Sequence, residues 1–265
     1  KKNNLKIVKI DKSKNLFNYE KKILIKELIL NCEYPVFFTG AGISTDSGIP
    51  DFRGPQGFWK TNSPIYYQDF IASEESRIKY WEQSINFKSN FGSFLPNDGH
   101  RAISKIITQK KQGHCITQNV DNLHQDSGLS SADITEIHGN ATSAKCLECK
   151  KKYSLKIFHD AVRNNEPIPA CNECSGLIKV ATISFGQPMN ADDLINAQNL
   201  TVDCDLFLVL GSSLVVQPVA SLPKIALENN AKLAIINNDE TPYDGLADIV
   251  INGKINEVIS KINLG

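Results

Sequence analysis

The sequence predicts an α/β fold: a Rossmann-like, doubly wound parallel sheet with a small zinc-ribbon module and a helical insertion. Short apolar runs at residues 35–39, 114–117, 205–210 and 232–236 are typical of buried parallel strands. Each run ends in a small or polar cluster, GAG, QNVD, GSS and NND in turn. Because ligands of such sheets bind beyond the carboxyl ends of the strands, we expect the four clusters to meet at one crevice. A single cluster of this kind would be equally typical of a turn or a helix cap.

The remaining segments complete the order of elements. Apolar spacing predicts a helix over 21–31, and another helix is expected over 100–108. Residues 55–100 are aromatic-rich and irregular, which predicts an insertion of loops and short helices, and a last strand over 248–252 precedes a C-terminal helix. We expect three units: a Rossmann-like dinucleotide-binding domain over 20–54, 101–140 and 183–265, a helical insertion over 55–100, and a zinc-ribbon module over 141–182.

The loop after the first strand has the composition of a phosphate-binding turn. It reads GAGISTDSGIPDFRG over residues 40–54. Gly40 and Gly42 allow a sharp turn and a close approach of the backbone to a ligand, which suits a pyrophosphate at the start of a helix. A dehydrogenase would have a third glycine where this chain has Thr45. The loop therefore predicts a dinucleotide site, but not one for hydride transfer.

Four of the seven cysteines form two Cys-x-x-Cys pairs, Cys146 with Cys149 and Cys171 with Cys174. The 21 residues between the pairs suit a tetrahedral zinc site. The alternative is a pair of redox dithiols, or disulfides in a secreted protein. Because no secretory signal opens the sequence and three further cysteines stand alone, zinc is favoured. No open ligand position with a nearby acid is apparent, so we expect the zinc to be structural.

The composition argues against two classes of partner. The 265 residues carry 29 basic and 29 acidic side chains, so no bulk positive charge attracts nucleic acid. No apolar stretch approaches the ~20 residues of a membrane span, and no signal peptide is recognisable. We therefore expect a cytoplasmic protein that binds neither nucleic acid nor membrane.

Seven motifs occur along the chain in a specific order. They are GAGISTDSGIPDFRG (40–54), TQNVDNLH (117–124), HGN (138–140), the two cysteine pairs, FGQP (185–188), LGSS (210–213) and INND (236–239). Together they resemble the motifs of the sirtuin family, the NAD-dependent protein-lysine deacylases, over about residues 25–262. The resemblance implies NAD as co-substrate, one structural Zn²⁺, and an acyl-lysine protein or peptide lying in a cleft between the NAD domain and the zinc module.

The resemblance also assigns the NAD site residue by residue. The first loop would hold the pyrophosphate and, in its mobile second half, cover the nicotinamide. The second cluster would line the nicotinamide and ribose pocket, and the last two clusters would contact the adenosine. The implied residues are Gly40, Ala41, Gly42 and Ser44 for the pyrophosphate, Asp51, Phe52, Arg53 and Trp59 for the mobile loop, Gln118, Asn119 and Asp121 for the ribose pocket, and Gly211, Ser212, Ser213, Asn237, Asp239 and Ala247 for the adenosine.

The catalytic residues follow from the same resemblance. A lone histidine before a glycine, such as His138, is by itself more often a structural residue, but here it matches the family's catalytic base. The acyl oxygen of the substrate would attack the ribose of NAD as nicotinamide leaves, and Asn119 and Asp121 could stabilise the developing positive charge. A histidine, with a pKa near neutrality, then suits the activation of a ribose hydroxyl. We expect His100 and His124 to pack or to hydrogen-bond.

The implied peptide site is a strand at 183–187 that pairs with the backbone of the substrate. The residues expected to contact the peptide are Ile183, Phe185 and Gly186. The chain departs from the family at Val180 and Gln187, where a proline and a glutamate are usual, which leaves the peptide preference open. Desuccinylating sirtuins carry a Tyr-x-x-Arg pair at the positions of Ser84 and Phe87, so we expect neutral acyl groups such as acetyl or longer fatty acyl chains.

Two other functions remain compatible with parts of the sequence. A protein ADP-ribosyltransferase or an NAD hydrolase would use the same fold and co-substrate, although the presence of His138 favours deacylation. A non-catalytic zinc-ribbon binding module would be expected to show a broken NAD pocket or a basic stripe, and the sequence shows neither.

Overall fold

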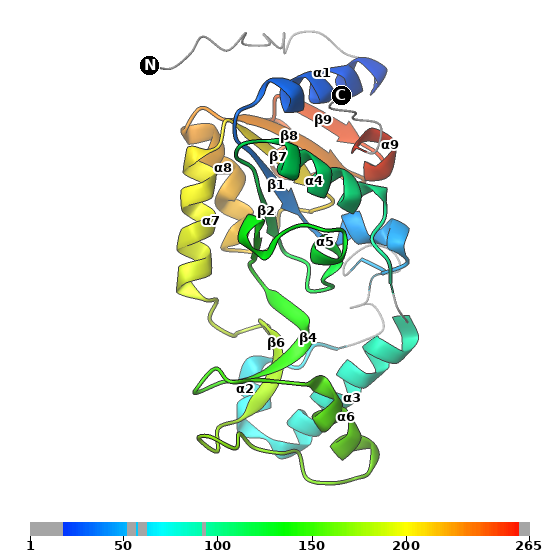
Figure 1. Ribbon diagram of the computed structural model, residues 1–265, viewed down its shortest axis with the longest axis vertical. Coiled ribbons are helices and arrows are strands. Elements are labelled where there is room, and N and C mark those ends of the chain that lie inside the picture. Colours follow the sequence, from blue (N-terminus) through cyan, green and yellow to red (C-terminus); the bar gives the residue numbers. More distant parts are fainter. Residues whose placement is uncertain (1–17, 52–56, 58–62, 92–93, 260–265) are drawn as a thin grey trace.

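The computed structural model describes residues 18–51, 57, 63–91 and 94–259, with the backbone alone over 88–91. Figure 1 shows two bodies, one above the other along the long axis. The larger is built on a six-stranded sheet and the smaller on a three-stranded sheet. Among the described residues, no helix is both long and apolar enough to span a membrane. The α/β class predicted from the sequence is confirmed.

The larger sheet is parallel throughout, with the strand order β3-β2-β1-β7-β8-β9. The chain winds outward from β1 on one side and from β7 on the other, so the order reverses between these two strands. In doubly wound sheets, ligands bind at such a switch point. The strands are β1 (Pro35–Thr39), β2 (His114–Thr117), β3 (Ile134–Glu136), β7 (Leu206–Leu210), β8 (Lys232–Asn237) and β9 (Ile249–Asn252).

Helices cover both faces of this sheet because its strands are apolar on both sides (Figure 1). Leu208 of β7 packs into one core cluster, and its neighbours Phe207 and Val209 pack into the opposite one. The first cluster is closed by α1, α4 and α9, and the second by α7 and α8. These helices are α1 (Asn18–Asn31), α4 (Asp98–Gln109), α7 (Ala191–Asp203), α8 (Leu222–Glu228) and α9 (Ile255–Ile259), while the short η1 (Ala41–Ser47) and α5 (Leu123–Asp126) follow β1 and β2.

The smaller body combines the cysteine-containing segment with the helical insertion. Its antiparallel sheet has the order β5-β4-β6, and α3 packs against α6 beside it. The contact is made by Trp81, which is fully buried and stacks on Phe158 with ring centroids 4.6 Å apart. Burying two such rings contributes several kcal/mol to the stability of this small core. The elements are α2 (Tyr67–Ala72), α3 (Glu74–Phe91), β4 (Gly139–Cys146), β5 (Lys152–Tyr153), α6 (Leu155–Arg163) and β6 (Ile178–Thr182).

Two expectations about the elements were wrong, and one strand was not predicted. The edge strand β3 is only three residues long, too short for a recognisable apolar pattern, and was not predicted. The insertion contains one long helix, the 18-residue α3, instead of short helices alone. The expected strand at 183–187 is absent because β6 ends before it and the chain turns. In that turn Gln187 N–H donates to Ser184 O at 2.9 Å, and Gly186 adopts the left-handed conformation with φ 77°.

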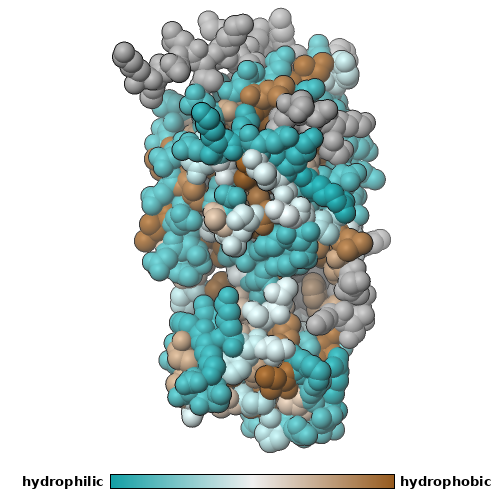
Figure 2. Space-filling view, viewed as in Figure 1, coloured by the Kyte–Doolittle hydropathy of each residue, from teal (hydrophilic) through white to brown (hydrophobic). Residues whose placement is uncertain are grey.

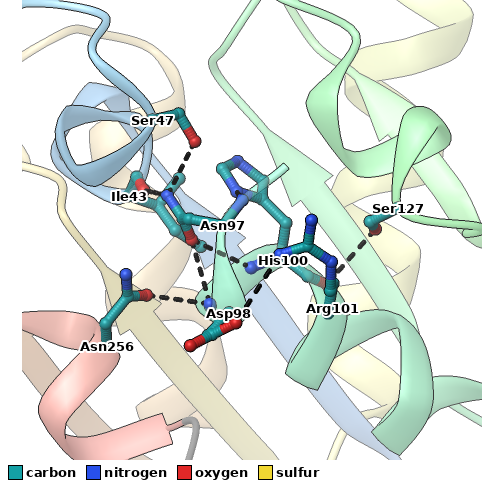
Figure 3. Close-up of polar contacts among 9 residues, drawn as sticks. Ile43, Ser47, Asn97, Asp98, His100, Arg101, Ser127 and Asn256 are labelled. Carbon is teal, nitrogen blue, oxygen red and sulfur yellow. Dashed lines mark hydrogen bonds and ion pairs between the residues drawn. The ribbon is translucent and has the colours of Figure 1, made fainter. Parts of the chain in front are cut away.

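Asn97 links the first loop to the start of α4 (Figure 3). Its Oδ1 caps α4 by accepting from the Gly99 amide at 2.9 Å. Its Nδ2 donates to Ile43 O at 2.7 Å and to Ser47 Oγ at 2.9 Å, both in η1. From α9, Asn256 Oδ1 accepts from the same Gly99 amide at 2.8 Å. The buried side-chain amide of Asn97 therefore holds η1 against the first turn of α4, and its hydrogen bonds are shielded from water. Asn256 joins α9 to the same turn through the Gly99 amide.

A buried histidine makes the fold sensitive to acid. Burial lowers the pKa of His114 in β2 from the ordinary 6.5 to about 4, and its Nε2 lies 2.9 Å from Thr135 Oγ1. Between these two pH values the unfolded chain binds the extra proton and the folded chain does not. The contribution of His114 to stability is therefore fully present above pH 6.5 and is lost as the pH falls towards about 4.

We expect His114→Gln, which keeps a polar partner for Thr135, to flatten the pH dependence of the free energy of unfolding over this interval. The slope should decrease by at most about 1.4 kcal/mol per pH unit, the effect of one proton. Urea unfolding at a series of pH values measures it, and equal slopes in the variant and the parent protein would contradict the assignment.

Candidate functional site

A cavity of about 1220 Å³ extends from the carboxyl ends of the larger sheet into the smaller body. All four polar clusters at the strand ends contribute to its wall. The sequence-predicted residues that line it are Gly40, Ala41, Gly42, Asp51, Gln118, Asn119, Asp121, His138, Ile183, Phe185, Gly186, Gly211, Ser212, Ser213, Asn237 and Asp239. The face seen in Figure 2 is mostly hydrophilic and is notched at the level where the two bodies meet.

The glycines of the first loop make room for another loop, while their backbone lines the cavity. A Cβ on Gly40 would lie 2.6 Å from Gly211 O, and one on Gly42 would lie 2.7 Å from Gly211 Cα. The Gly42 amide donates to Gly211 O at 2.9 Å. Gly211 itself has φ 66°, and a Cβ there would lie 2.5 Å from Ile43 N. The loops after β1 and β7 are therefore in direct backbone contact at the switch point.

Ser44, Asn119 and Asp121 form a polar group at the floor of the cavity. Ser44 Oγ donates to Asp121 Oδ2 at 2.7 Å, and Leu123 N–H donates to Asp121 Oδ1 at 3.0 Å. Burial raises the pKa of the Asp121 carboxyl, and these two hydrogen bonds oppose that effect. Asn119 Nδ2 donates to Gly40 O at 3.1 Å and to Ser44 Oγ at 3.2 Å. Asn119 Oδ1 has no partner among the described residues. The Asp121 carboxylate and this amide oxygen can therefore both stabilise a positive charge in the cavity.

Two histidines support this floor from behind. His124 Nε2 lies 2.9 Å from Thr39 Oγ1, and the rings of His100 and His124 stand edge to face with centroids 4.9 Å apart. His100 Nε2 reaches Ser44 Oγ at 3.4 Å. Burial lowers the pKa of His100 to about 4 and that of His124 well below its ordinary value. Both rings are therefore neutral packing and hydrogen-bonding groups at neutral pH, as expected.

His138 enters the cavity from the junction of the two bodies, just before β4. Its Nδ1 lies 3.1 Å from Gln118 O, and because a carbonyl only accepts, Nδ1 carries the proton of the neutral ring. Nε2 is then the nitrogen that can accept a proton. The backbone of Gln118 thus orients the ring, while the Gln118 side chain donates to Ser212 Oγ at 2.6 Å. This geometry suits a general base.

Some predicted residues lie away from the cavity wall. Ser44 is fully buried behind it and acts through Asn119 and Asp121. Ala247 packs against the core cluster beneath α7 and α8, so it is not part of the wall. Its predicted adenine contact is not supported by this geometry. Phe52, Arg53 and Trp59 lie outside the described residues.

Sequence reasoning missed several segments of the wall, and one of them follows β9. Gly253, Lys254 and Ile255 follow β9 and line the cavity beside the cluster that follows β8. The signal was available, because a strand was predicted over 248–252 and residues beyond the carboxyl ends of parallel strands are candidates for ligand contact. Lys254 places a positive charge at this end of the cavity.

The four cysteines of the two pairs come together in the smaller body, away from the cavity. Their sulfur atoms all lie within 4.8 Å of one another. The distance between Sγ atoms is 3.5 Å for Cys146 and Cys174 and also for Cys149 and Cys171. Tetrahedral zinc with Zn–S bonds of about 2.3 Å places its sulfur ligands about 3.8 Å apart. The cluster therefore fits one zinc ion closed by four thiolates, with no position left for a substrate.

The two cysteine pairs have the same backbone geometry. The residue after each pair is left-handed, Lys150 with φ 66° and Ser175 with φ 60°. In each, the first cysteine donates its amide to a carbonyl five residues on: Cys146 to Lys151 O and Cys171 to Gly176 O, both at 2.9 Å. Two equivalent turns thus present two sulfur atoms each to a common centre, which is the geometry of a structural metal site.

Comparison with known proteins places the chain in one family. The model of the Sir2 family matches residues 40–218. An NAD-dependent protein deacetylase of Rhodopseudomonas palustris is 42% identical over 88% of this chain and 92% of its own length. An NAD-dependent protein deacylase of Archaeoglobus fulgidus is 37% identical over 89% and 92%. A solved structure of Sir2 with a p53 peptide and NAD⁺ has a TM-score of 0.77 and 32% identity over 90% of this chain and 95% of that one.

We expect Gly211→Ala to lower the free energy of unfolding by about 2–4 kcal/mol, because the new methyl group meets backbone atoms and the left-handed conformation disfavours a side chain. Gly245→Ala is the matched control, since a Cβ at that position has nothing within 4 Å. It should change stability by less than about 1 kcal/mol. Urea unfolding measures both, and equal losses would show that the loop contact is unimportant.

We expect the purified protein to contain about one zinc per chain and Cys146→Ser to lose it, because removing one thiolate opens the tetrahedral site. Limited proteolysis should then cut preferentially between residues 141 and 182. Cys32→Ser changes a cysteine far from the cluster in sequence, whose Sγ donates to Ile29 O of α1, and should retain the metal. Metal analysis of the two variants decides the question, and full zinc retention in Cys146→Ser would contradict it.

Proposed function

The chain belongs to the Sir2, or sirtuin, family, and we infer that it is an NAD-dependent protein-lysine deacylase. It converts acyl-lysine and NAD to lysine, nicotinamide and 2′-O-acyl-ADP-ribose. The observation that carries this function is the placement of His138. Its ring, oriented by Gln118 O at 3.1 Å, lines the same cavity as the strand-end loops and the polar floor. A base is thus available where a dinucleotide and a peptide can meet.

We propose that NAD lies along the carboxyl edge of the larger sheet. Gly40, Ala41 and Gly42 lie at the pyrophosphate, next to the loop of Gly211, whose backbone they contact. The adenosine occupies the end formed by the clusters after β7, β8 and β9, where we add Lys254 to the predicted residues. The residues proposed for this half are Gly211, Ser212, Ser213, Asn237, Asp239 and Lys254, and those for the nicotinamide half are Asp51, Gln118, Asn119 and Asp121.

The catalytic groups have separate tasks. Bound NAD supplies a ribose carbon from which nicotinamide can leave. Asp121 and Asn119 Oδ1 present negative charge and an oxygen dipole towards the positive charge that develops there, and Ser44 holds both residues in place. His138 Nε2 accepts a proton from a ribose hydroxyl, while its Nδ1–H remains bonded to Gln118 O.

We propose that the peptide enters beside the turn after β6. Ile183, Phe185 and Gly186 line the cavity there. The Ile183 amide already donates to His138 O at 2.8 Å, and Phe185 O accepts from the Tyr67 amide at 2.9 Å. Backbone pairing with a peptide must therefore use the other polar groups of the turn, or displace the Tyr67 contact.

The division of the chain follows from these assignments. We propose that 20–54, 101–140 and 183–265 bind NAD and that 141–182 is the zinc module. The insertion 55–100 shares its core with the zinc module through Trp81. We also propose a cytoplasmic location, because four zinc thiolates and three further free cysteines suit a reducing compartment.

We expect His138→Ala to reduce peptide-dependent release of nicotinamide and O-acyl-ADP-ribose by about 10²–10⁴-fold, the usual contribution of a positioned general base. Mass spectrometry of reactions with NAD and an acetyl-lysine peptide measures both products. His114→Gln, which alters a histidine outside the cavity wall, is the control and should retain activity. Equal nicotinamide release with and without peptide would instead indicate an NAD hydrolase, and ADP-ribose on the protein would indicate a transferase.

A further inference from the structure

The cavity continues beyond His138 into a chamber of the smaller body. One face of α3 forms its wall, with Tyr80, Ser84 and Phe87 at positions i, i+4 and i+7. Leu155 of α6 and Val180 of β6 add further apolar side chains, and Gln83 of α3 and Thr182 of β6 are polar but uncharged members of the same wall. Among the described lining residues of these three elements, none is charged. The chamber is therefore a mostly apolar space at the opposite end of the cavity from the NAD loops.

This chamber is connected to the reaction centre through β6. Thr182, the last residue of β6, pairs with Gly139, which directly follows His138. Tyr80 Oη lies 3.5 Å from Thr182 Oγ1, so the α3 wall begins beside the catalytic histidine. One turn along α3, about 6 Å away, is Ser84. An acyl group whose carbonyl reacts beside His138 can direct its tail only away from the dinucleotide, into this chamber.

Ser84 makes a polar contact within these apolar surroundings. Its Oγ lies 3.0 Å from His159 Nε2 of α6. His159 is almost fully buried, and its ring packs edge to face on Trp81 with centroids 6.0 Å apart. The imidazole is therefore held in place and fixes the hydroxyl that it contacts. A serine hydroxyl has one donor and two acceptor sites, so after bonding His159 it can still bond a ligand.

We propose that Ser84, oriented by His159, is a specificity-determining residue for acyl chains with a hydroxyl group a few carbons beyond the carbonyl. The proposal rests on the deacylase function inferred above. A plain hydrocarbon chain would shield Ser84 Oγ from solvent and leave it with His159 as its one partner. A hydroxylated chain would offer Ser84 Oγ a new hydrogen bond in place of the one lost to solvent. A site built to hydrogen-bond a group discriminates against the analogue that lacks it more strongly than an apolar pocket discriminates by size. An acidic tail would find no cation on the described walls of the chamber.

The test compares two peptides that differ by one oxygen atom, carrying butyryl-lysine or 3-hydroxybutyryl-lysine in the same sequence. For the parent protein we expect kcat/KM to be about tenfold higher for the hydroxylated peptide, the effect of one buried hydrogen bond. In Ser84→Ala the ratio of the two kcat/KM values should fall to about one. Activity on acetyl-lysine should be unchanged, because the acetyl group is too short to reach Ser84, one turn of α3 beyond Tyr80.

Two further variants separate specificity from folding. Ser76→Ala is the matched control, the same substitution two helical turns earlier on α3 and outside the cavity wall, and should keep the parent ratio. His159→Phe keeps a ring against Trp81 but removes the partner of Ser84, and should lower the ratio while acetyl-lysine activity persists. A parent ratio of one or less, or an unchanged ratio in Ser84→Ala, would overturn the proposal and leave deacylation intact. Failure to turn over any acyl-lysine peptide, acetyl included, would instead overturn the proposed function itself.

Discussion

The site depends on the backbone contact between the loop after β1 and Gly211 at the end of β7. Three glycines permit it, because a Cβ on Gly40, Gly42 or Gly211 would overlap the opposing backbone. The contact brings together the two strands from which the chain winds in opposite directions, so the carboxyl ends of the sheet form one crevice. Asn97 then anchors the adjoining η1 to the start of α4, and Asn256 of α9 accepts from the Gly99 amide in the same turn. The relative position of the loops after β1 and β7 follows from this junction.

The second constraint is the crossing of the chain between the two bodies. β4 begins immediately after His138, and β6 returns beside it, where Ile183 N–H donates to His138 O. The zinc cluster fixes the far ends of the same strands, since Cys146 is the last residue of β4 and the second cysteine pair precedes β6. A metal bound by these cysteines would thereby constrain both strands that flank the proposed base and the turn after β6.

The electrostatics of the cavity floor are consistent with cleavage of a cationic co-substrate. Buried His100 and His124 have lowered pKa values and stay neutral, so they do not oppose positive charge. Burial raises the pKa of the Asp121 carboxyl, and hydrogen bonds from Ser44 and the Leu123 amide to its oxygens oppose that shift. The floor therefore offers a carboxylate in a position shielded from water, where its effect on a developing cation is larger than in solution.

The sequence by itself determined the central strands and the cysteine pairs. It also predicted that the four polar clusters at the strand ends line one cavity. These features are local: strands buried on both faces are continuously apolar, and small or polar residues mark where each one ends. It did not determine the edge strand β3, the turn after β6, the role of Gly40 and Gly42 or the contact of Ser84 with His159. Each of these depends on a partner far along the chain, and no local pattern encodes which distant residue will be close. Tertiary packing decided them, because only the folded chain brings α3 against α6 and the β1 loop against Gly211.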